Sequence, residues 1–228
     1  MKAFILAAGR GERMRPLTDS TPKPLLCAGG KPLIVWHLER LQASGFHDVV
    51  INHAHLGEQI EAALGNGNRF GLSIRYSPEP PGALETAGGI AHALDLLGSE
   101  SFLVVNGDVW CDWDFRRAHA LAGHDAHLVF VDNPAQHAGG DFCLDGETVR
   151  YASTGIGPTL TYAGTGVFSP AFFATVPASA VMKMRPLLDA AIARGIVSGE
   201  RHAGRWVDVG TPERLAELDQ QLNEQLRT

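Results

Sequence analysis

The chain has 228 residues, which is enough to bury a sizeable core and suits one domain with at most a small insertion. Hydrophobic residues make up 45% and charged residues 19%, and the net charge of −6 gives no global basic field for nucleic acid or an anionic membrane. No apolar run reaches the roughly 18 residues of a membrane span. Cys27, Cys111 and Cys143 lack the spacing of a zinc site or disulfide framework, so we expect reduced thiols. We expect a cytoplasmic protein, a monomer or small homo-oligomer.

Strand and helix patterns alternate along the first half of the chain. Apolar spacing predicts strands at residues 2–6, 48–52, 72–76 and 102–106, and helices at residues 32–44, 56–64 and 86–97. Gly45, Gly65 and Gly98 follow the helical stretches, as is typical of helix ends. The run FLVVN at residues 102–106 is apolar throughout, which indicates a strand covered on both faces. This alternation predicts a mostly parallel sheet with right-handed crossovers.

The pattern changes after about residue 132. Two short strand-like stretches flank Asp145-Gly146, which is a hairpin turn signal. The further predicted elements are strands at 141–144, 147–151, 160–168 and 205–209, a helix at 182–194, and a last helix from Thr211-Pro212 to about Gln225. We therefore predict a single α/β domain over residues 1–228, with a mostly parallel mixed sheet and a small β-rich insertion at about 133–168.

The loop after the first strand, in MKAFILAAGRGERMRPLTDSTPKPLL, concentrates positive charge in an acidic chain. It lacks the third glycine of a dinucleotide fingerprint and the GK[ST] of a Walker A loop, and its prolines exclude a helix. Gly9 and Gly11 nevertheless let backbone N–H groups approach a phosphate, and Arg13, Arg15 and Lys23 supply charge. The alternative is a solvated basic loop. We predict a phosphate-binding loop at the carboxyl edge of the sheet, where ligands of open α/β sheets bind.

Two aspartates follow apolar stretches. Asp108 lies in NGD directly after the strand at 102–106, and Asp208 lies in WVDVGT. If both strands belong to the sheet, both carboxylates reach the edge that carries the basic loop. Two carboxylates with open positions suit Mg²⁺. The alternative for each is a turn or helix-cap aspartate.

Glycine pairs and histidines allow weaker predictions. Gly88-Gly89 either forms a wall for a nucleobase or only packs closely at a helix start, and Asp141 after a glycine pair either meets sugar hydroxyls or belongs to a simple hairpin. His53, His55, His124 and His127 have no full ligand set around them and are expected at the surface.

The stretch LAAGRGERMRPLT…TPKPLL resembles the signature LAAGxGxRxxPLTxxxPKPL of the sugar-1-phosphate nucleotidyltransferases. These enzymes join a nucleoside triphosphate to a sugar-1-phosphate and release pyrophosphate. The resemblance implies their fold, a Rossmann-like three-layer nucleotide-diphospho-sugar transferase domain. It also implies that the positive charge serves the triphosphate and the leaving pyrophosphate.

The resemblance further implies residue roles. The family's metal-binding aspartates match Asp108 and Asp208, Arg13 matches the group that neutralises the leaving pyrophosphate, and Lys23 would sit between the two phosphates. The residues implied to hold the nucleotide are Ala7, Ala8, Gly9, Gly11, Glu12, Arg13, Lys23, Gly88 and Asn106. The residues implied on the substrate side are Glu85, Asp141, Gly164 and Thr165. Ala87 and the PPGA stretch at 80–83 depart from the family pattern and concern the fit of base or sugar.

Longer stretches, including NGDVWCDWDF and LVFVDNPAQHAGGDF, are most similar to short bacterial uridylyltransferases of this family that act in cell-wall recycling. That similarity implies UTP and N-acetylmuramic acid 1-phosphate as substrates, with Mg²⁺. Three alternatives stay open: UTP or dTTP with glucose-1-phosphate, GTP with mannose-1-phosphate, and a non-catalytic sugar-nucleotide-binding subunit. The missing third glycine disfavours a dinucleotide-dependent oxidoreductase.

Overall fold

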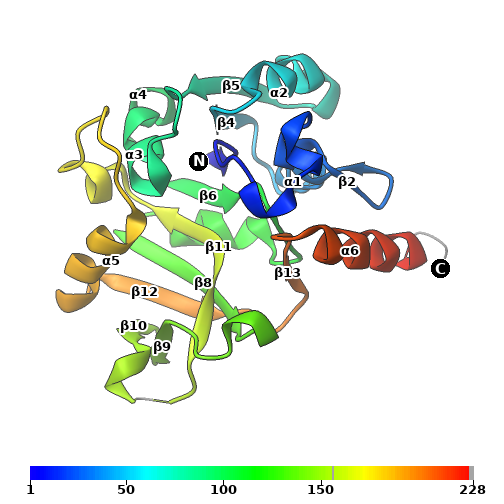
Figure 1. The fold of residues 1–228 in the computed structure, drawn as a ribbon. Coiled ribbons are helices and arrows are strands. Elements are labelled where there is room, and N and C mark those ends of the chain that lie inside the picture. Colours follow the sequence, from blue (N-terminus) through cyan, green and yellow to red (C-terminus); the bar gives the residue numbers. More distant parts are fainter. Residues whose placement is uncertain (156, 226–228) are drawn as a thin grey trace.

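A nine-stranded mixed sheet runs through the centre of the computed structural model, which describes residues 1–155 and 157–225 (Figure 1). The strand order is β5-β4-β1-β6-β11-β8-β12-β10-β9. The strands are β1 (Lys2–Leu6), β4 (Asp48–His53), β5 (Ser73–Pro78), β6 (Phe102–Asn106), β8 (Ala126–Asp132), β9 (Phe142–Asp145), β10 (Thr148–Tyr151), β11 (Leu160–Phe168) and β12 (Val197–Arg201). Two ribbons lie outside the sheet: β2 (Cys27–Ala28) with β3 (Lys31–Pro32), and β7 (Val109–Cys111) with β13 (Trp206–Asp208).

The predicted α/β class with a large, mostly parallel sheet is confirmed. Strands β5, β4, β1 and β6 are all parallel, and β12 is parallel to β8. Leu6 is in register with both Asn52 and Asn106, so the carboxyl ends of three strands meet at one edge. Antiparallel pairs occur where β11 runs between β6 and β8 and where β9 and β10 extend the far edge. The β-rich segment 133–168 therefore continues the main sheet, and its last strand is central.

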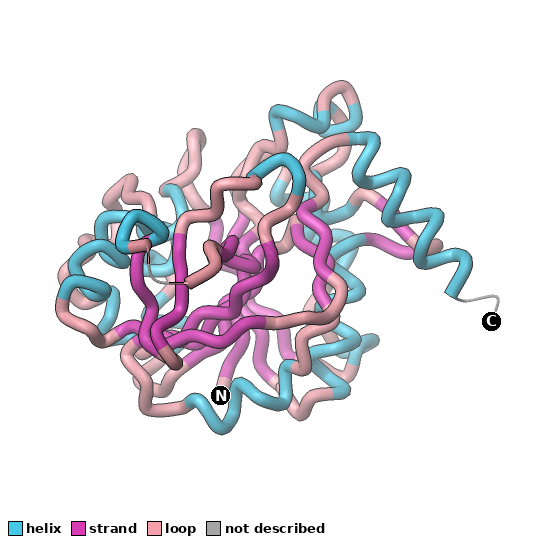
Figure 2. Tube along the Cα trace, turned by 90° about the horizontal axis from the view of Figure 1, so that it is seen from below, coloured by secondary structure: helices cyan, strands magenta, loops and turns pink. Residues whose placement is uncertain are grey.

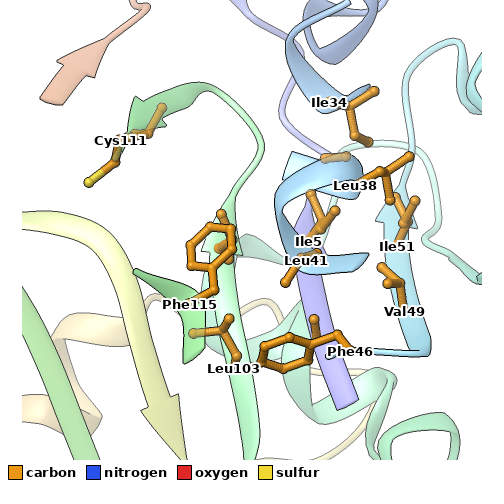
Figure 3. Packing of buried hydrophobic residues seen from close by; sticks show 14 of the residues in the cluster. Ile5, Ile34, Leu38, Leu41, Phe46, Val49, Ile51, Leu103, Cys111 and Phe115 are labelled. Atoms are coloured by element: carbon orange, nitrogen blue, oxygen red, sulfur yellow. The ribbon is translucent and has the colours of Figure 1, made fainter. Parts of the chain in front are cut away.

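Helices cover both faces of the sheet, as Figures 1 and 2 show. Side chains of β1 alternate between two apolar clusters: Ala3 and Ile5 belong to one and Phe4 to the other. The first cluster includes α1 (Leu33–Ala43) and α2 (Gly57–Leu64), and the second includes α3 (Glu85–His92), α4 (Leu94–Leu97) and α5 (Met184–Ala193). In Figure 3, Leu38 and Leu41 of α1 lie against Ile5 and against Ile51 of β4. Packing of the helices on both faces of the sheet fixes the strands, whose carboxyl ends carry the candidate site described below.

The predicted helix at 86–97 is wrong in one respect, because it consists of α3 and α4 separated at Ala93. The N–H of Ala93 is shared between the carbonyls of Gly89 and Ile90, an arrangement common at helix ends. Strands β2, β3, β7, β8 and β12 were not predicted. No helix in the described part of the chain is long and apolar enough to span a bilayer.

The last helix, α6 (Pro212–Gln225), matches its predicted bounds and projects beside the β2–β3 ribbon (Figures 1 and 2). Its buried Leu218 and Leu222 join a third apolar cluster with Met14 of the basic loop and Val209. The helix is thereby tied to both segments that surround the candidate site.

Candidate functional site

The basic loop folds into three short 3₁₀ turns, Glu12–Met14, Leu17–Asp19 and Lys23–Leu25, so the predicted absence of an α-helix is confirmed. Gly11 has a φ of +70°, and a β-carbon there would lie 3.0 Å from Thr18 Cγ2 and 3.3 Å from Lys23 Cβ. The Thr18 hydroxyl donates to the Gly11 carbonyl at 2.9 Å. Only glycine combines this backbone conformation with so close an approach. The loop is therefore wrapped tightly around the start of the Lys23 turn.

Lys23 is the buried cation of this loop. Its residue is 6% exposed, and its Nζ lies 2.7 Å from Asp108 Oδ2. A buried ammonium requires such a partner, because desolvation without a counter-ion is costly. Lys23 and Asp108 thus form a fixed pair at the carboxyl edge of the sheet.

A cavity of about 440 Å³ opens between the basic loop and the start of α3. All but one of the residues expected at the nucleotide line it: Ala7, Ala8, Gly9, Gly11, Glu12, Arg13, Lys23 and Asn106. Gly88 does not line it. The space above Gly88 is filled by the Ala180 carbonyl, which agrees with the packing alternative for this glycine. Glu85, expected at the substrate side, lines this first cavity.

A buried polar network on the cavity wall was not predicted, although the sequence weakly indicated that Asn52, at the end of the strand at 48–52, faces a nucleobase. The Ala7 N–H donates to Asn52 Oδ1 at 2.7 Å, and Asn52 Nδ2 donates to Glu79 Oε1 at 2.6 Å. Glu79 Oε2 accepts from the Leu84 N–H at 2.7 Å. Asn52 lies at the end of β4, and Glu79 directly follows β5. Their position at the carboxyl edge of the sheet was the one feature of the sequence that could have identified them.

This network joins the basic loop to the segment before α3. Leu84 lies between Ala83 and Glu85, whose φ angles of 58° and 61° are left-handed. Such angles cost a non-glycine residue roughly 1 kcal/mol or more, so other contacts must hold them. The Glu79 carboxylate, in a residue 9% exposed, supplies one such contact.

Asp108 and Asp208 come together, although not as predicted. The prediction required the strands before Asp108 and around Asp208 to belong to one sheet, whereas Asp208 ends β13, which pairs with β7 in a separate ribbon. In that ribbon Asp208 is in register with Val109, and the Val209 N–H donates to the Asp108 carbonyl at 3.0 Å. The short antiparallel β7–β13 ribbon, rather than the main sheet, therefore brings the two aspartates together.

Each of the two aspartates has a cationic partner. Asp108 pairs with Lys23, and Asp208 Oδ2 lies 2.6 Å from Arg214 Nη1 on α6. A β-carbon on Gly210 would lie 2.6 Å from Arg214 Nη2, 3.1 Å from Arg13 Nη2 and 3.1 Å from Asp208 Oδ2. Arg13, Arg214 and Asp208 thus converge on one glycine of the cavity wall. Arg214 was not predicted, because its role depends on how α6 packs.

A second cavity of about 260 Å³ adjoins the first and shares Asn106 and Asp108 with it. Its other lining residues are Val109, Pro134, Gln136, His137, Thr161, Tyr162, Gly164, Trp206 and Asp208. Of the residues expected on the substrate side, Gly164 lines it, and a β-carbon there would lie 2.8 Å from Asn106 Nδ2. Thr165 is buried opposite Val105 and lines neither cavity. Asp141 also lines neither cavity, and its carboxylate pairs with His137 at 2.9 Å.

Burial shifts several titratable groups near the site. It lowers the pKa of His37 on α1 from 6.5 to about 4, with Arg40 adding to the effect and Asp108 opposing it. It raises the pKa of Tyr162 in the second cavity. The expectation of surface histidines is wrong for His53 and His127, which are buried. His53 Nε2 lies 2.7 Å from Glu61 Oε1, which compensates the burial of this ring. His127 Nδ1 lies 2.9 Å from the Ser198 hydroxyl, while its buried Nε2 has no hydrogen-bond partner among the described residues.

Comparison with known proteins places this site in a family. The nucleotidyl transferase family model matches residues 2–140, which include the basic loop and Asp108. The chain is 54% identical over 222 residues to the N-acetylmuramate alpha-1-phosphate uridylyltransferase of Neisseria meningitidis serogroup B, covering 95% of this chain and 96% of that protein. It is 34% identical over 241 residues to the protein of the same name from Caulobacter vibrioides, covering 97% of each.

A solved structure shares the fold. The crystal structure of a putative glucose-1-phosphate thymidylyltransferase from Bacillus anthracis, in complex with a sucrose, superposes with a TM-score of 0.83 at 23% sequence identity. The superposition covers 98% of this chain and 96% of that one. The arrangement of sheet, ribbon and helices therefore matches that of a nucleotidyltransferase structure.

Proposed function

The chain belongs to the nucleotidyl transferase family, and we propose that it transfers the uridylyl group of UTP to N-acetylmuramic acid 1-phosphate. The products are UDP-N-acetylmuramic acid and pyrophosphate, and the reaction would serve cell-wall recycling in the cytoplasm. The observation that carries this proposal is the junction of the two cavities, where Asn106 and Asp108 line both. Identity of 54% across nearly the whole chain supports UTP and the acidic amino sugar as the pair.

Each of the two cavities suits one of the two substrates. The first lies against the glycine-bearing loop, whose N–H groups and cations suit a triphosphate, and the second suits the sugar. A phosphate oxygen of the sugar-1-phosphate would attack the α-phosphorus of UTP, forming a P–O bond as the bond from the α-phosphorus to the bridging oxygen breaks. The electron pair leaves with pyrophosphate. The sugar phosphate is already anionic at neutral pH, so alignment and charge neutralisation are the main tasks of the protein.

Two cationic groups suit that neutralisation. Lys23 lies at the wall of the first cavity beside Asp108, where the two phosphates would meet. Arg13 lines the same cavity and approaches Gly210, a position that suits the leaving pyrophosphate. Preorganised charges of this kind stabilise a transition state without reorganising during the reaction.

The two aspartates fit a divalent cation, for which we propose Mg²⁺. Both carboxylates line the second cavity, and hard oxygen ligands with open positions are what Mg²⁺ prefers. Asp108 and Asp208 would hold the ion, which supplies positive charge beside the reacting phosphates when bound. The cationic partner that each carboxylate has in this structure supports the proposal that a cation binds between them.

The test is a substrate panel. The protein is incubated with Mg²⁺, each nucleoside triphosphate and a set of sugar-1-phosphates, and released pyrophosphate is measured. We expect UTP with N-acetylmuramic acid 1-phosphate to give the highest kcat/KM. A strong preference for glucose-1-phosphate with UTP or dTTP, or for mannose-1-phosphate with GTP, would contradict the substrate assignment and leave the reaction class intact. No pyrophosphate with any pair would favour a non-catalytic binding subunit.

The variant Lys23→Ala tests the chemistry in the same assay. Loss of a charge that acts mainly in the transition state costs ~10²–10³ in kcat. Lys31→Ala, at a lysine that lines neither cavity, is the matched control and should keep its activity. Near-normal turnover of Lys23→Ala would reject the role given to Lys23.

A further inference from the structure

The ionised side chains that line the second cavity are acidic, although the substrate that we propose is itself anionic. N-acetylmuramic acid 1-phosphate carries two anionic groups, the phosphate on C1 and the carboxylate of the lactyl ether on C3. The cavity wall already holds the carboxylates of Asp108 and Asp208. Among the described residues that line it, His137 is the one side chain that can carry a positive charge. An anionic sugar substituent therefore has a single cationic partner available there.

We propose that His137 binds the lactyl carboxylate and thereby selects an acidic amino sugar over a neutral one. This inference rests on the proposed function and adds to it the residue that recognises the acidic group of the sugar. An imidazolium paired with a carboxylate forms a charge-assisted hydrogen bond, which is among the stronger polar contacts in proteins. A neutral sugar leaves that donor without its partner, so the preference comes from a difference between two acceptors.

The turn that carries His137 is built to hold it. The His137 N–H donates to the Pro134 carbonyl at 2.8 Å, and the Gly140 N–H donates to the His137 carbonyl at 3.1 Å. Asn133 fastens the same turn, since its Nδ2 donates to the Ala138 carbonyl at 3.2 Å and to the Thr159 hydroxyl at 2.7 Å. The imidazole therefore sits on a braced turn at the cavity wall.

Asp141 orients the ring. Its Oδ2 lies 2.9 Å from His137 Nε2, and its backbone is fixed because its N–H donates to the Leu160 carbonyl at 3.0 Å. Arg185 Nη1 lies 3.8 Å from the other carboxylate oxygen of Asp141, and the same arginine pairs with Asp189. Arg185 therefore restrains the Asp141 carboxylate. His137 Nδ1 has no hydrogen-bond partner within residues 1–155 and 157–225. With Nε2 committed to Asp141, Nδ1 is the donor left for the substrate. Asp141 is thus a positioning residue for His137 rather than a direct sugar ligand.

The experiment compares two acceptors that differ in the lactyl group. kcat and KM are measured with UTP and either N-acetylmuramic acid 1-phosphate or N-acetylglucosamine 1-phosphate. The proteins are the wild type, His137→Gln, His137→Lys, Asp141→Asn and the control His119→Gln, an exposed histidine that lines neither cavity.

We expect His137→Gln to lower kcat/KM for the acidic sugar by roughly 10- to 100-fold, mainly through KM, as for loss of a charged hydrogen bond. The neutral sugar should change by less than about twofold, because it makes no such contact. Asp141→Asn should act in the same direction with a smaller effect, and His137→Lys should regain part of the preference.

Two results overturn the inference alone. Either the His137→Gln protein keeps the wild-type preference, or it loses activity equally with both acceptors, as a merely structural residue would. A wild type that does not use N-acetylmuramic acid 1-phosphate overturns the proposed function instead. The wild-type measurement therefore separates the two failures before any variant is compared.

Discussion

At the scale of single residues, the site is organised by pairs of opposite charge. Lys23 with Asp108 and Arg214 with Asp208 place a cation on each carboxylate that would hold a divalent ion. The side chains of Arg214 and Asp208 are 19% and 25% exposed, so solvent screens this pair only in part. An incoming ion must share Asp208 with Arg214 or displace it.

Removing Arg214 should therefore strengthen metal binding in the absence of nucleotide. Arg214→Ala deletes a charge-assisted contact that is worth about 1.5 kcal/mol or more, which corresponds to roughly tenfold in Mn²⁺ affinity. The Mn²⁺ affinity is measured by titrating the nucleotide-free protein with Mn²⁺ and monitoring the titration by electron paramagnetic resonance. Arg214→Lys keeps the charge and is expected to bind much like the wild type. An unchanged or weaker affinity in Arg214→Ala would show that the arginine does not compete for Asp208.

The residues that sequence analysis could and could not identify differ in how they reach the site. Lys23 and Asp108 lie at the carboxyl edge of the sheet within short motifs, so position along the chain was sufficient. Glu79 and Arg214, which were not predicted, reach the cavities through contacts with distant segments. The local pattern singled out Asp141 but as a direct sugar contact, whereas its carboxylate pairs with His137, a contact that depends on the turn at 135–137.

At the scale of secondary-structure elements, α6 controls the geometry of Asp208. The helix begins four residues after this aspartate and is anchored at its other end by Gly29. The Gly29 N–H donates to Asp219 Oδ1 at 2.8 Å, and a β-carbon on Gly29 would lie 2.7 Å from Leu222 Cβ and 2.8 Å from Trp36 Cζ2. No side chain fits between this turn and the helix.

The neighbouring glycines Gly29 and Gly30 provide a matched test of that anchor. Both have positive φ, +61° and +78°, so alanine costs each a similar backbone penalty of roughly 1–2 kcal/mol. Only Gly29 faces α6, because nothing lies within 4 Å of a β-carbon at Gly30. We expect Gly29→Ala to lower the free energy of unfolding by about 1–3 kcal/mol more than Gly30→Ala, owing to overpacking. Urea denaturation of the two variants measures this, and equal losses would refute the anchoring role.

Helix α1 carries a buried histidine that should make stability depend on pH. Burial lowers the pKa of His37 from 6.5 to about 4, and its Nδ1 has no hydrogen-bond partner in the described part of the chain. The unfolded chain therefore binds a proton between those two pH values while the folded chain does not, so stability falls as pH falls from 6.5 to 4. A shift of this size corresponds to about 3 kcal/mol.

His37→Leu removes this titration and keeps the position apolar. The difference in unfolding free energy between wild type and variant should move in favour of the variant by up to about 3 kcal/mol as pH falls from 6.5 to 4. Urea titrations at several pH values give that difference, and carboxylates that titrate in both proteins cancel from it. A difference that does not change with pH would mean that folding does not lower the pKa of His37.

At the scale of the whole molecule, the parallel half of the fold was predictable and the second half was less so. The strands at 2–6 and 48–52 are short apolar stretches with a clear helical repeat between them, and their parallel pairing follows from that single crossover. The antiparallel insertion of β11 between β6 and β8 depends on long-range pairing that no local pattern specifies. The β7–β13 ribbon is of the same kind, since its strands have three residues each.

That ribbon is also what makes one site from two distant parts of the chain. Asp108 follows the central sheet and Asp208 precedes the last helix, and their backbones meet through the Val209 N–H and the Asp108 carbonyl. The account depends on both carboxylates serving one divalent cation.

The most direct test is the number of Mn²⁺ ions bound with a non-hydrolysable UTP analogue, measured by electron paramagnetic resonance. The wild type and the control Asp95→Asn, at an exposed aspartate of α4, should each bind one ion tightly. Asp108→Asn and Asp208→Asn should each lose that ion, because either change removes a ligand from the same site. Full Mn²⁺ binding in the Asp208→Asn protein would contradict the shared site.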